Sequence, residues 1–309
     1  MNTGSAVQFV DKQLVEKYPE LQLLKDKNGL GLWGNYVVLE EIGKGVYGSV
    51  WRAVGCSSQQ MFAIKKMHTD QVWQENEIHS TQREISFLQS LKHQNIVQLK
   101  DVLTLGFQDV RPVFELLKCD LGEVLKDLKR NGQMMCMEDL RRYSSDRLEG
   151  LYACHARSVM HRDLKAQNLL LTHEGSLKIA GFRLAREMVV PNPSHSTDVV
   201  TLWYRAPEMF LGAQNYGCEI DCWSAGCVMA EMATNRPLFP GDCEVDTLFK
   251  IFRLLGSPSD THWPGGMALR HWRGRYPKWQ DTGLKPLFDR RPELQGEWRP
   301  SPAALVLVP

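Results

Sequence analysis

The pattern of apolar residues changes near residue 119, and this change restricts the chain to folds that join a β-sheet to a helical body. Residues 36–117 hold short runs rich in β-branched and aromatic side chains, such as YVVLEEIG and MFAIKKM, each bounded by turn residues. One amphipathic helical pattern interrupts them at 75–92. Helical patterns then dominate, at 138–157, 219–234 and 245–255. This order predicts an α+β fold, in which a small β-rich lobe precedes a larger helical lobe.

The composition indicates a folded intracellular protein without a polyanionic partner. The 309 residues carry 37 Lys and Arg against 36 Asp and Glu, a net charge of +1. No basic surface for nucleic acid or for an anionic membrane is therefore expected. The N-terminus lacks the features of a secretory signal, and no apolar run approaches the roughly 18 residues of a membrane span. We expect a protein of the nucleus or cytoplasm, with its eight cysteines reduced.

Two terminal segments lie outside the predicted lobes, which occupy residues 36–117 and 118–287. Residues 1–35 form a mixed-charge extension that closes on a Gly-rich stretch, and the sequence assigns it no role. Residues 288–309 show no helical periodicity and include four prolines. We therefore expect an irregular tail there.

Three features of the first lobe indicate a phosphate-binding site. GKGVYGSV at 43–50 lies between two strand-like runs. This setting fits a flap whose backbone amides approach phosphates. It does not fit the dinucleotide fingerprint, which needs a strand followed by a helix.

Lys65 lies at the centre of an apolar strand pattern. The simpler interpretation is that its side chain lies on the solvent-exposed face of that strand. Glu84, however, shares a helical stripe with Leu88, and a carboxylate on a buried stripe needs a partner. A capping box that begins at Thr81 is the rival explanation for Glu84.

The run HRDLKAQNLLL at 161–171 gathers His, Arg, Asp, Lys and Asn before an apolar stretch. Together with Ala206-Pro207-Glu208, the glycine loop and the lysine, it resembles eukaryotic protein kinases. The resemblance covers residues 36–287 and implies a bilobal protein kinase-like fold. HSTQREISFL, VVTLWYRAPE and PGDCEVDTLFKIFRLLGSP are similar to segments of cyclin-dependent kinases. We favour that branch over the mitogen-activated kinases.

The resemblance implies roles in catalysis and ATP binding for the residues that match. Asp163 would accept the proton of the substrate hydroxyl, Lys165 would contact the γ-phosphate, and Asn168 would bind magnesium. Lys65, paired with Glu84, would hold the α- and β-phosphates. The other implied ATP-binding residues are the three phosphate-covering glycines Gly43, Gly45 and Gly48, the adenine contacts Ile42, Val50, Ala63 and Leu170, and the hinge residues Phe114, Glu115 and Leu117.

The resemblance also implies control by phosphorylation. Arginine pairs bidentately with phosphate, so an arginine cluster suits a phosphorylated activation loop. Asp221 resembles the buried aspartate that binds the backbone of the catalytic loop, and such a carboxylate should be hydrogen-bonded. The implied regulatory residues are Ser196 or, alternatively, Thr197 as the phosphosite, the clamping arginines Arg83, Arg162 and Arg186, and Tyr47 as an inhibitory tyrosine.

The sequence departs from the kinase pattern at the magnesium site. Where the family has Asp-Phe-Gly, this chain has Gly181-Phe182-Arg183, so Mg²⁺ binding is expected to be weakened or absent. Losing the carboxylate should slow phosphoryl transfer by about a hundredfold to a thousandfold. One hypothesis is that the Arg183 cation partly neutralises the phosphates without metal. The alternatives are that Arg183 points to solvent or pairs with Glu84.

The end of the chain departs as well. The family continues beyond residue 287 with two helices, one of which carries an arginine that pairs with the glutamate of Ala-Pro-Glu, here Glu208. We therefore expect a truncated C-terminus, as an adaptation or as an aberrant gene product. Arg290, Arg291 or Arg299 would then substitute for the missing partner of Glu208.

These expectations combine into one function and its alternatives. We expect an ATP-binding Ser/Thr kinase of the cyclin-dependent type that acts on Ser/Thr-Pro sites of proteins, with impaired activity. A cyclin-like subunit is the expected partner, and neither nucleic acid nor a membrane is expected. The alternative is a pseudokinase that serves as a nucleotide- and cyclin-binding scaffold. A third interpretation is a non-productive protein from a damaged gene.

Overall fold

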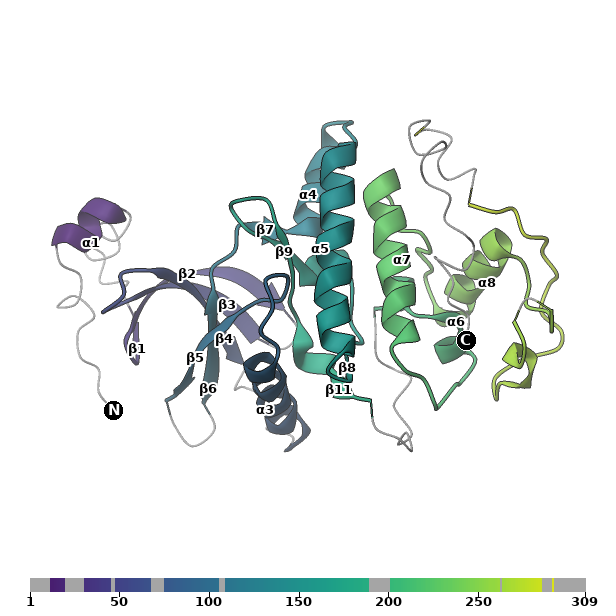
Figure 1. Cartoon of the computed structure of the whole chain (residues 1–309), viewed down its shortest axis with the longest axis horizontal. Helices are drawn as coiled ribbons and strands as arrows, with labels where there is room; N and C mark the ends of the chain where they lie inside the picture. The colour runs from purple at the N-terminus through teal and green to yellow at the C-terminus, as the bar shows by residue number, and fades with distance from the viewer. Residues whose placement is uncertain are drawn as a thin grey trace. The chain divides into compact units, whose positions relative to one another are not determined.

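The computed structural model describes residues 12–19, 31–45, 48–67, 75–105, 109–188, 201–261, 263–284 and 291. The chain divides into two compact units, of which the first comprises Met1–Lys92 with Val97–Leu117 and the second His93–Ile96 with Lys118–Pro309. Strands dominate the first unit and helices dominate the second (Figure 1). The predicted α+β fold is confirmed. Within the described ranges, no helix is both long and apolar enough to cross a bilayer.

A six-stranded antiparallel sheet forms the first unit, in the order β1-β2-β3-β4-β6-β5. Successive residues of a strand face opposite sides of the sheet. Tyr36, Val38 and Ile64 accordingly belong to one buried cluster, whereas Val37 and Leu39 belong to another. The strands are β1 (Gly31–Trp33), β2 (Tyr36–Gly45), β3 (Gly48–Gly55), β4 (Met61–Met67), β5 (Leu99–Thr104) and β6 (Val110–Glu115).

The described part of the N-terminal extension packs on this sheet. It includes the short helix α1 (Lys12–Lys17). Val15 and Tyr18 pack against the cluster that contains Val37 and Leu39. Lys17 and Tyr18 also donate hydrogen bonds to the carbonyl of Gln59, at 2.9 and 3.3 Å. The extension therefore covers an apolar part of the sheet, which the sequence did not indicate.

The single long helix of the described first unit is α3 (Glu75–Ser90), close to the predicted 75–92. Its buried side chains recur at helical spacing, as expected for one face turned to a core. Thr81, Glu84 and Leu88 are all buried, whereas Ile85 is partly exposed. The stripe therefore carries a carboxylate at its centre.

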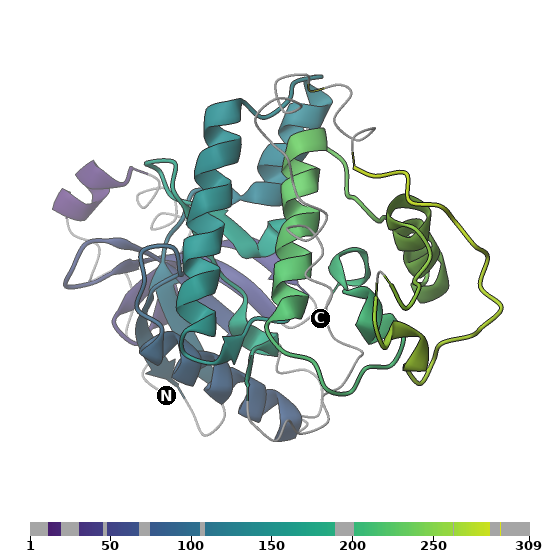
Figure 2. The same cartoon turned by 45° about the vertical axis from the view of Figure 1, so that its right-hand side comes forward.

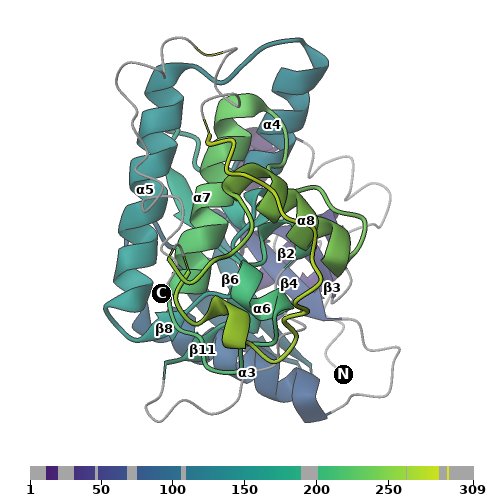
Figure 3. The ribbon, with the colours of Figure 1, turned by 90° about the vertical axis from the view of Figure 1, so that its right-hand side faces the viewer.

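The second unit is built around two long helices, α5 (Met137–His155) and α7 (Glu219–Thr234), which lie side by side (Figures 1 and 2). Of the 16 residues of α7, 12 are buried, as expected for a helix that is apolar on all sides. The short helix α6 (Pro207–Phe210) packs against α8 (Glu244–Leu255) (Figure 3). The remaining α-helix in the described part of this unit is α4 (Leu121–Arg130).

Short strands of the second unit bring two loops together. In one sheet β9 (Leu169–Leu171) pairs with both β7 (Cys119–Asp120) and β10 (Leu177–Ile179). In a second sheet β8 (Val159–Met160) pairs with β11 (Arg186–Glu187). The loop from β8 to β9 spans residues 161–168, and the loop from β10 to β11 spans residues 180–185. Because the flanking strands are paired, these two loops are held against each other.

Candidate active site

Lys65 and Glu84 form an ion pair within the first unit. The Lys65 Nζ lies 2.7 Å from Oε2 and 3.0 Å from Oε1 of Glu84. The Glu84 side chain is 3% exposed and that of Lys65 is 20% exposed. Glu84 is thus the buried carboxylate that needed a partner, and Lys65 supplies it. The capping-box explanation is wrong, because Thr81 lies six residues inside α3 rather than at its N-terminus.

The sheet places a partly apolar surface beside this ammonium. Val50 pairs directly with Lys65 across β3 and β4, and Ala63 is two residues from Lys65 on the same face. Val50 and Ala63 are both partly exposed, and Ile42 in β2 is 46% exposed. A ring system could pack on these side chains while its phosphates approach the ammonium.

The β2–β3 hairpin carries the predicted glycine loop. Gly43 pairs with Val50, and Gly45 pairs with Gly48. A Cβ on Gly48 would lie 2.3 Å from the carbonyl oxygen of Lys66, whereas one on Gly43 would meet its nearest atom at 3.8 Å. Gly48 is therefore required by backbone packing. Tyr47 lies outside the described residues.

Two of the predicted hinge residues, Phe114 and Glu115, lie on β6. Phe114 pairs with Ala63 across the β4–β6 ladder. Glu115 is fixed by Gln98, because the Glu115 backbone N–H donates to the Gln98 carbonyl at 3.2 Å and the Gln98 N–H donates to the Glu115 carboxylate at 2.8 Å. Leu117 is partly exposed at the end of the first unit.

Asp163 is the centre of a hydrogen-bond network in the second unit. Its carboxylate accepts from Lys165 Nζ at 2.8 and 3.1 Å, from Asn168 Nδ2 at 2.9 Å and from Thr201 Oγ1 at 3.2 Å. Lys165 also donates to Thr201 Oγ1, at 3.0 Å. The side chain of Asp163 remains 14% exposed. Hydrogen bonds therefore fix the carboxylate in position while part of it stays open to solvent, as a general base requires.

Asp221 in α7 holds the backbone of the same loop. Its carboxylate accepts the N–H groups of His161 and Arg162, each at 2.8 Å, and it lies 3.0 Å from His155 Nε2. Burial raises the pKa of Asp221, but the hydrogen bond from His155 and the charges of nearby histidines outweigh it and leave that pKa lowered. Arg162 has a φ of 66°, an uncommon value for a non-glycine residue. Asp221 therefore stabilises a strained loop conformation.

Gly181 lies against Asn168. Its φ is +85°, and a Cβ there would meet the Asn168 side chain at 2.6 to 2.8 Å. The Asn168 amide donates to the backbone carbonyl of Asp163 at 2.6 Å as well as to its carboxylate. His161 bridges the two loops through its Nε2, 2.9 Å from the Ala180 oxygen. The amide of Asn168 thus occupies the space into which a side chain at position 181 would project.

A family model of the protein kinase domain matches residues 36–280. This chain belongs to the protein kinase family. The match confirms the kinase fold expected from the sequence, and it covers the Lys65 pair of the first unit and the Asp163 network of the second. Protein kinases transfer phosphoryl groups from ATP with the help of Mg²⁺.

The magnesium site of this kinase does not have its usual donors. Mg²⁺ prefers carboxylate and other oxygen ligands. Position 181 offers no carboxylate, and the Asn168 amide fills the adjoining space. The described residues therefore lack one oxygen donor of the family's metal site.

Arg183, the other unusual residue of this segment, is buried, with 9% exposure. The interpretation that it points to solvent is therefore wrong. Phe182 beside it is fully buried and packs edge-on against His161, with ring centroids 4.9 Å apart. The loop after β10 is thus anchored by its aromatic residue, as the catalytic loop is by Asp221.

Part of the predicted phosphate clamp can be described. Arg162 stacks over Tyr216, 5.7 Å from the ring centroid. Burial raises the pKa of Tyr216, and the charges of Arg162 and Arg186 counteract this. Arg83 lies on α3 in the first unit. The predicted phosphosites, Ser196 and Thr197, lie outside the described residues.

Glu208 is buried without a cation at its carboxylate in the described part of the chain. Burial and the nearby charge of Glu219 raise its pKa to about 7, although its own backbone N–H lowers it. Arg291 does not substitute for the expected partner, because its guanidinium donates to the carbonyls of Ala233, at 3.1 Å, and Met135. Arg290 and Arg299 lie outside the described residues.

Sequence reasoning missed Thr201, which bonds to both Asp163 and Lys165. The only signal was its position immediately before the LWYRAPE segment. Leu170, predicted to contact adenine, lies in β9 and is partly exposed, and it pairs there with Lys178 and Asp120.

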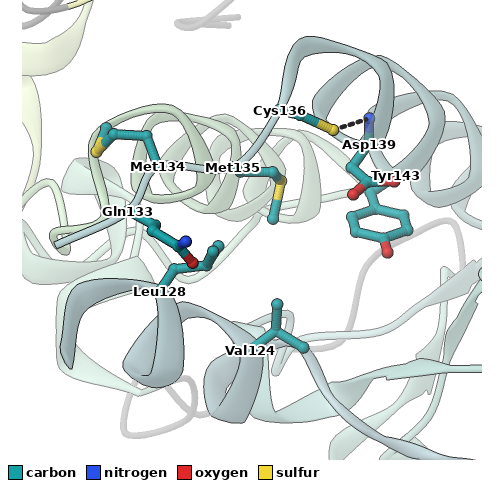
Figure 4. Close-up of a pocket in the computed structure, with 8 residues that line it drawn as sticks. All are labelled: Val124, Leu128, Gln133, Met134, Met135, Cys136, Asp139 and Tyr143. Atoms are coloured by element: carbon teal, nitrogen blue, oxygen red, sulfur yellow. Dashed lines mark hydrogen bonds between the residues drawn. The ribbon is translucent and has the colours of Figure 1, made fainter. Parts of the chain in front are cut away.

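A separate cavity of about 450 Å³ lies between α4 and the start of α5. Figure 4 shows Val124 and Leu128 of α4 on one side and Met134 and Met135 of the connecting segment on the other. Cys136 caps α5 by accepting the N–H of Asp139 at 3.5 Å. No predicted site residue lines this cavity, which is bounded mainly by apolar side chains.

Proposed function

We propose that this kinase transfers the γ-phosphoryl group of ATP to Ser or Thr hydroxyls of proteins, at a rate limited by the glycine at position 181. The observation that carries the proposal is the Asp163 carboxylate held by Lys165, Asn168 and Thr201. Such a group is fixed in position yet partly open to a substrate, as general base catalysis needs.

The proposed step uses groups of this chain in defined roles. The substrate hydroxyl oxygen forms a bond to the γ-phosphorus, and the bond from that phosphorus to the β,γ-bridging oxygen breaks, so ADP leaves. Asp163 accepts the hydroxyl proton. Lys165 and Lys65 each place an ammonium against negative phosphate oxygens, which is the electrostatic part of phosphoryl transfer.

Two sequence segments support a cyclin-dependent type. HSTQREISFL covers residues 79–88 of α3, the segment that we assign to a cyclin-like subunit. VVTLWYRAPE spans residues 199–208 and supports substrates with Ser/Thr-Pro sites. With such a partner, the kinase would act in the nucleus or cytoplasm.

A pseudokinase is the second candidate, and the contact between Gly181 and Asn168 favours it. The Asn168 side chain fills the space beside Gly181, where the family has a carboxylate for the metal, and its amide nitrogen donates to Asp163. In that case the chain would bind nucleotide through Lys65 and Glu84 and act as a scaffold.

Radiolabelled ATP and a Ser-Pro peptide distinguish the two candidates. We expect slow transfer by the natural chain, none by Asp163→Asn, and faster transfer by Gly181→Asp with Mg²⁺. Aspartate tolerates a positive φ better than most residues, and Asn168 must turn aside to make room. Transfer by Gly181→Asp alone would establish the pseudokinase, and transfer that survives Asp163→Asn would contradict both the mechanism and the role of this site.

A further inference from the structure

A cavity of about 760 Å³ in the second unit adjoins the Asp163 network. Lys165 and Thr201 belong to its wall, and both hydrogen-bond to the Asp163 carboxylate. A peptide whose hydroxyl reaches Asp163 would therefore pass along this cavity. The described residues that line it are Gly122, Leu125, Lys126, Lys129, Lys165, Gln167, Thr201, Trp203, Tyr204, Glu231, Asn235, Arg236, Pro237 and Pro240.

Cations dominate the charged part of this wall. Lys126 and Lys129 lie one turn apart on α4, Arg236 follows α7, and all three are exposed. None of these three has an ion-pair partner in the part of the chain that the structure describes. Lys165 adds a fourth cation to the wall, but its charge is already paired with Asp163.

The single carboxylate in the described lining does not balance them. Glu231 is buried, with 8% exposure, and it accepts a 2.8 Å hydrogen bond from the Tyr204 hydroxyl. Burial also raises the pKa of Glu231, against the effect of that hydrogen bond. The exposed charge of the cavity is therefore positive, although the whole chain is nearly neutral.

The uncharged part of the wall suits a polypeptide. Leu125, Trp203, Pro237 and Pro240 contribute apolar surface, and Trp203 is 40% exposed although its indole N–H donates to the Gly241 carbonyl at 2.9 Å. Apolar surface combined with a few placed charges is typical of sites that orient a bound chain.

We propose that this cavity binds Asp and Glu side chains of the protein substrate and so directs the kinase to acidic sites. The proposal rests on the proposed function, because it takes Asp163 as the point where the substrate hydroxyl is held. Opposite charge would select the substrate here, and the selection would weaken as salt screens these exposed groups.

Fluorescence anisotropy with the full chain tests the proposal without requiring turnover. Three labelled peptides of equal length share one Ser-Pro core and differ only in carrying three Glu, Gln or Lys residues beside it. We expect the Glu peptide to bind about tenfold more tightly than the Gln peptide at low salt, as a few exposed ion pairs allow.

Charge reversal in the cavity should invert this preference. The triple variant Lys126→Glu, Lys129→Glu and Arg236→Glu should bind the Lys peptide more tightly than the Glu peptide. Arg130→Glu is the matched control, because Arg130 is an exposed cation of α4 that does not line the cavity. The control should keep the acidic preference, and circular dichroism shows that both variants are folded.

Each result separates the cavity assignment from the proposed function. Equal binding of the Glu and Gln peptides, or unchanged preference in the triple variant, would overturn the assignment. An oligonucleotide of matched charge that binds as tightly as the Glu peptide would also overturn it, in favour of a general polyanion surface. Selective binding without any transfer of labelled phosphate would support the cavity assignment and contradict the proposed enzyme.

Discussion

Arg147 in α5 is a charged residue without a partner in the core of the second unit, and its replacement should stabilise the protein. The residue is 1% exposed, and its Nε and Nη1 atoms have no hydrogen-bond partner in the structure as described. Burial lowers the pKa of Arg147 to about 10, against an opposing effect from Cys227. An unpaired buried cation is one of the costliest features of a folded chain.

The pKa gives the size of this cost. The ordinary arginine pKa is about 12.5, and each pH unit of difference corresponds to about 1.4 kcal/mol. Arg147 therefore costs the folded state about 3 kcal/mol at neutral pH, an order-of-magnitude figure. Arg147→Met keeps a long side chain and removes the charge. For a unit of this size, we expect a rise in Tm of about 6 to 12 °C.

Differential scanning calorimetry at pH 7.5 provides the measurement, with Leu148→Met as the control. Leu148 is the next residue of the helix and is 53% exposed, so its replacement should leave the Tm unchanged. Because the pKa is lowered in the folded state, the penalty is complete below pH 10 and fades as pH rises above it. An Arg147→Met variant with unchanged or lower Tm would refute the reasoning.

Three further predictions concern single residues. Glu208→Gln should stabilise the chain by about 3 kcal/mol at pH 8 and by nothing at pH 4. The pKa of Glu208 is raised from 4.5 to about 7, so its charged carboxylate destabilises the folded state only as the pH rises through that range. Equal stabilisation at both pH values, measured by urea unfolding, would contradict this. Gly48→Ala should cost about 1–3 kcal/mol in the same assay, and Gly43→Ala should cost less, since only the former Cβ meets a backbone oxygen at 2.3 Å. Lys65→Met should abolish the rise in Tm that ATP produces, whereas retention of that rise would exclude the Lys65–Glu84 pair from nucleotide binding.

Much of the fold follows from local pattern. Helices predicted at 219–234 and 245–255 are observed at Glu219–Thr234 and Glu244–Leu255, because a continuous apolar or amphipathic period leaves few other structures open. The sequence also predicted that Glu84 needs a partner, because the helix face that carries it is otherwise apolar. The burial of Arg147 could have been read in the same way, because it lies four residues after Tyr143 and four before Leu151, both buried.

The sequence alone determined the longest helices, the strand-rich character of the first lobe, the order of the two lobes and the family, because these depend on residues close together in the chain. Only the tertiary structure showed that the Asn168 side chain lies against Gly181 and that Thr201 is hydrogen-bonded to Asp163. It also showed that the Arg291 guanidinium donates to the Ala233 carbonyl and does not pair with Glu208. Each of these contacts joins residues 13 or more positions apart, so it depends on how packed strands and helices place their side chains. The spacing of apolar residues along the chain holds no information about such long-range contacts.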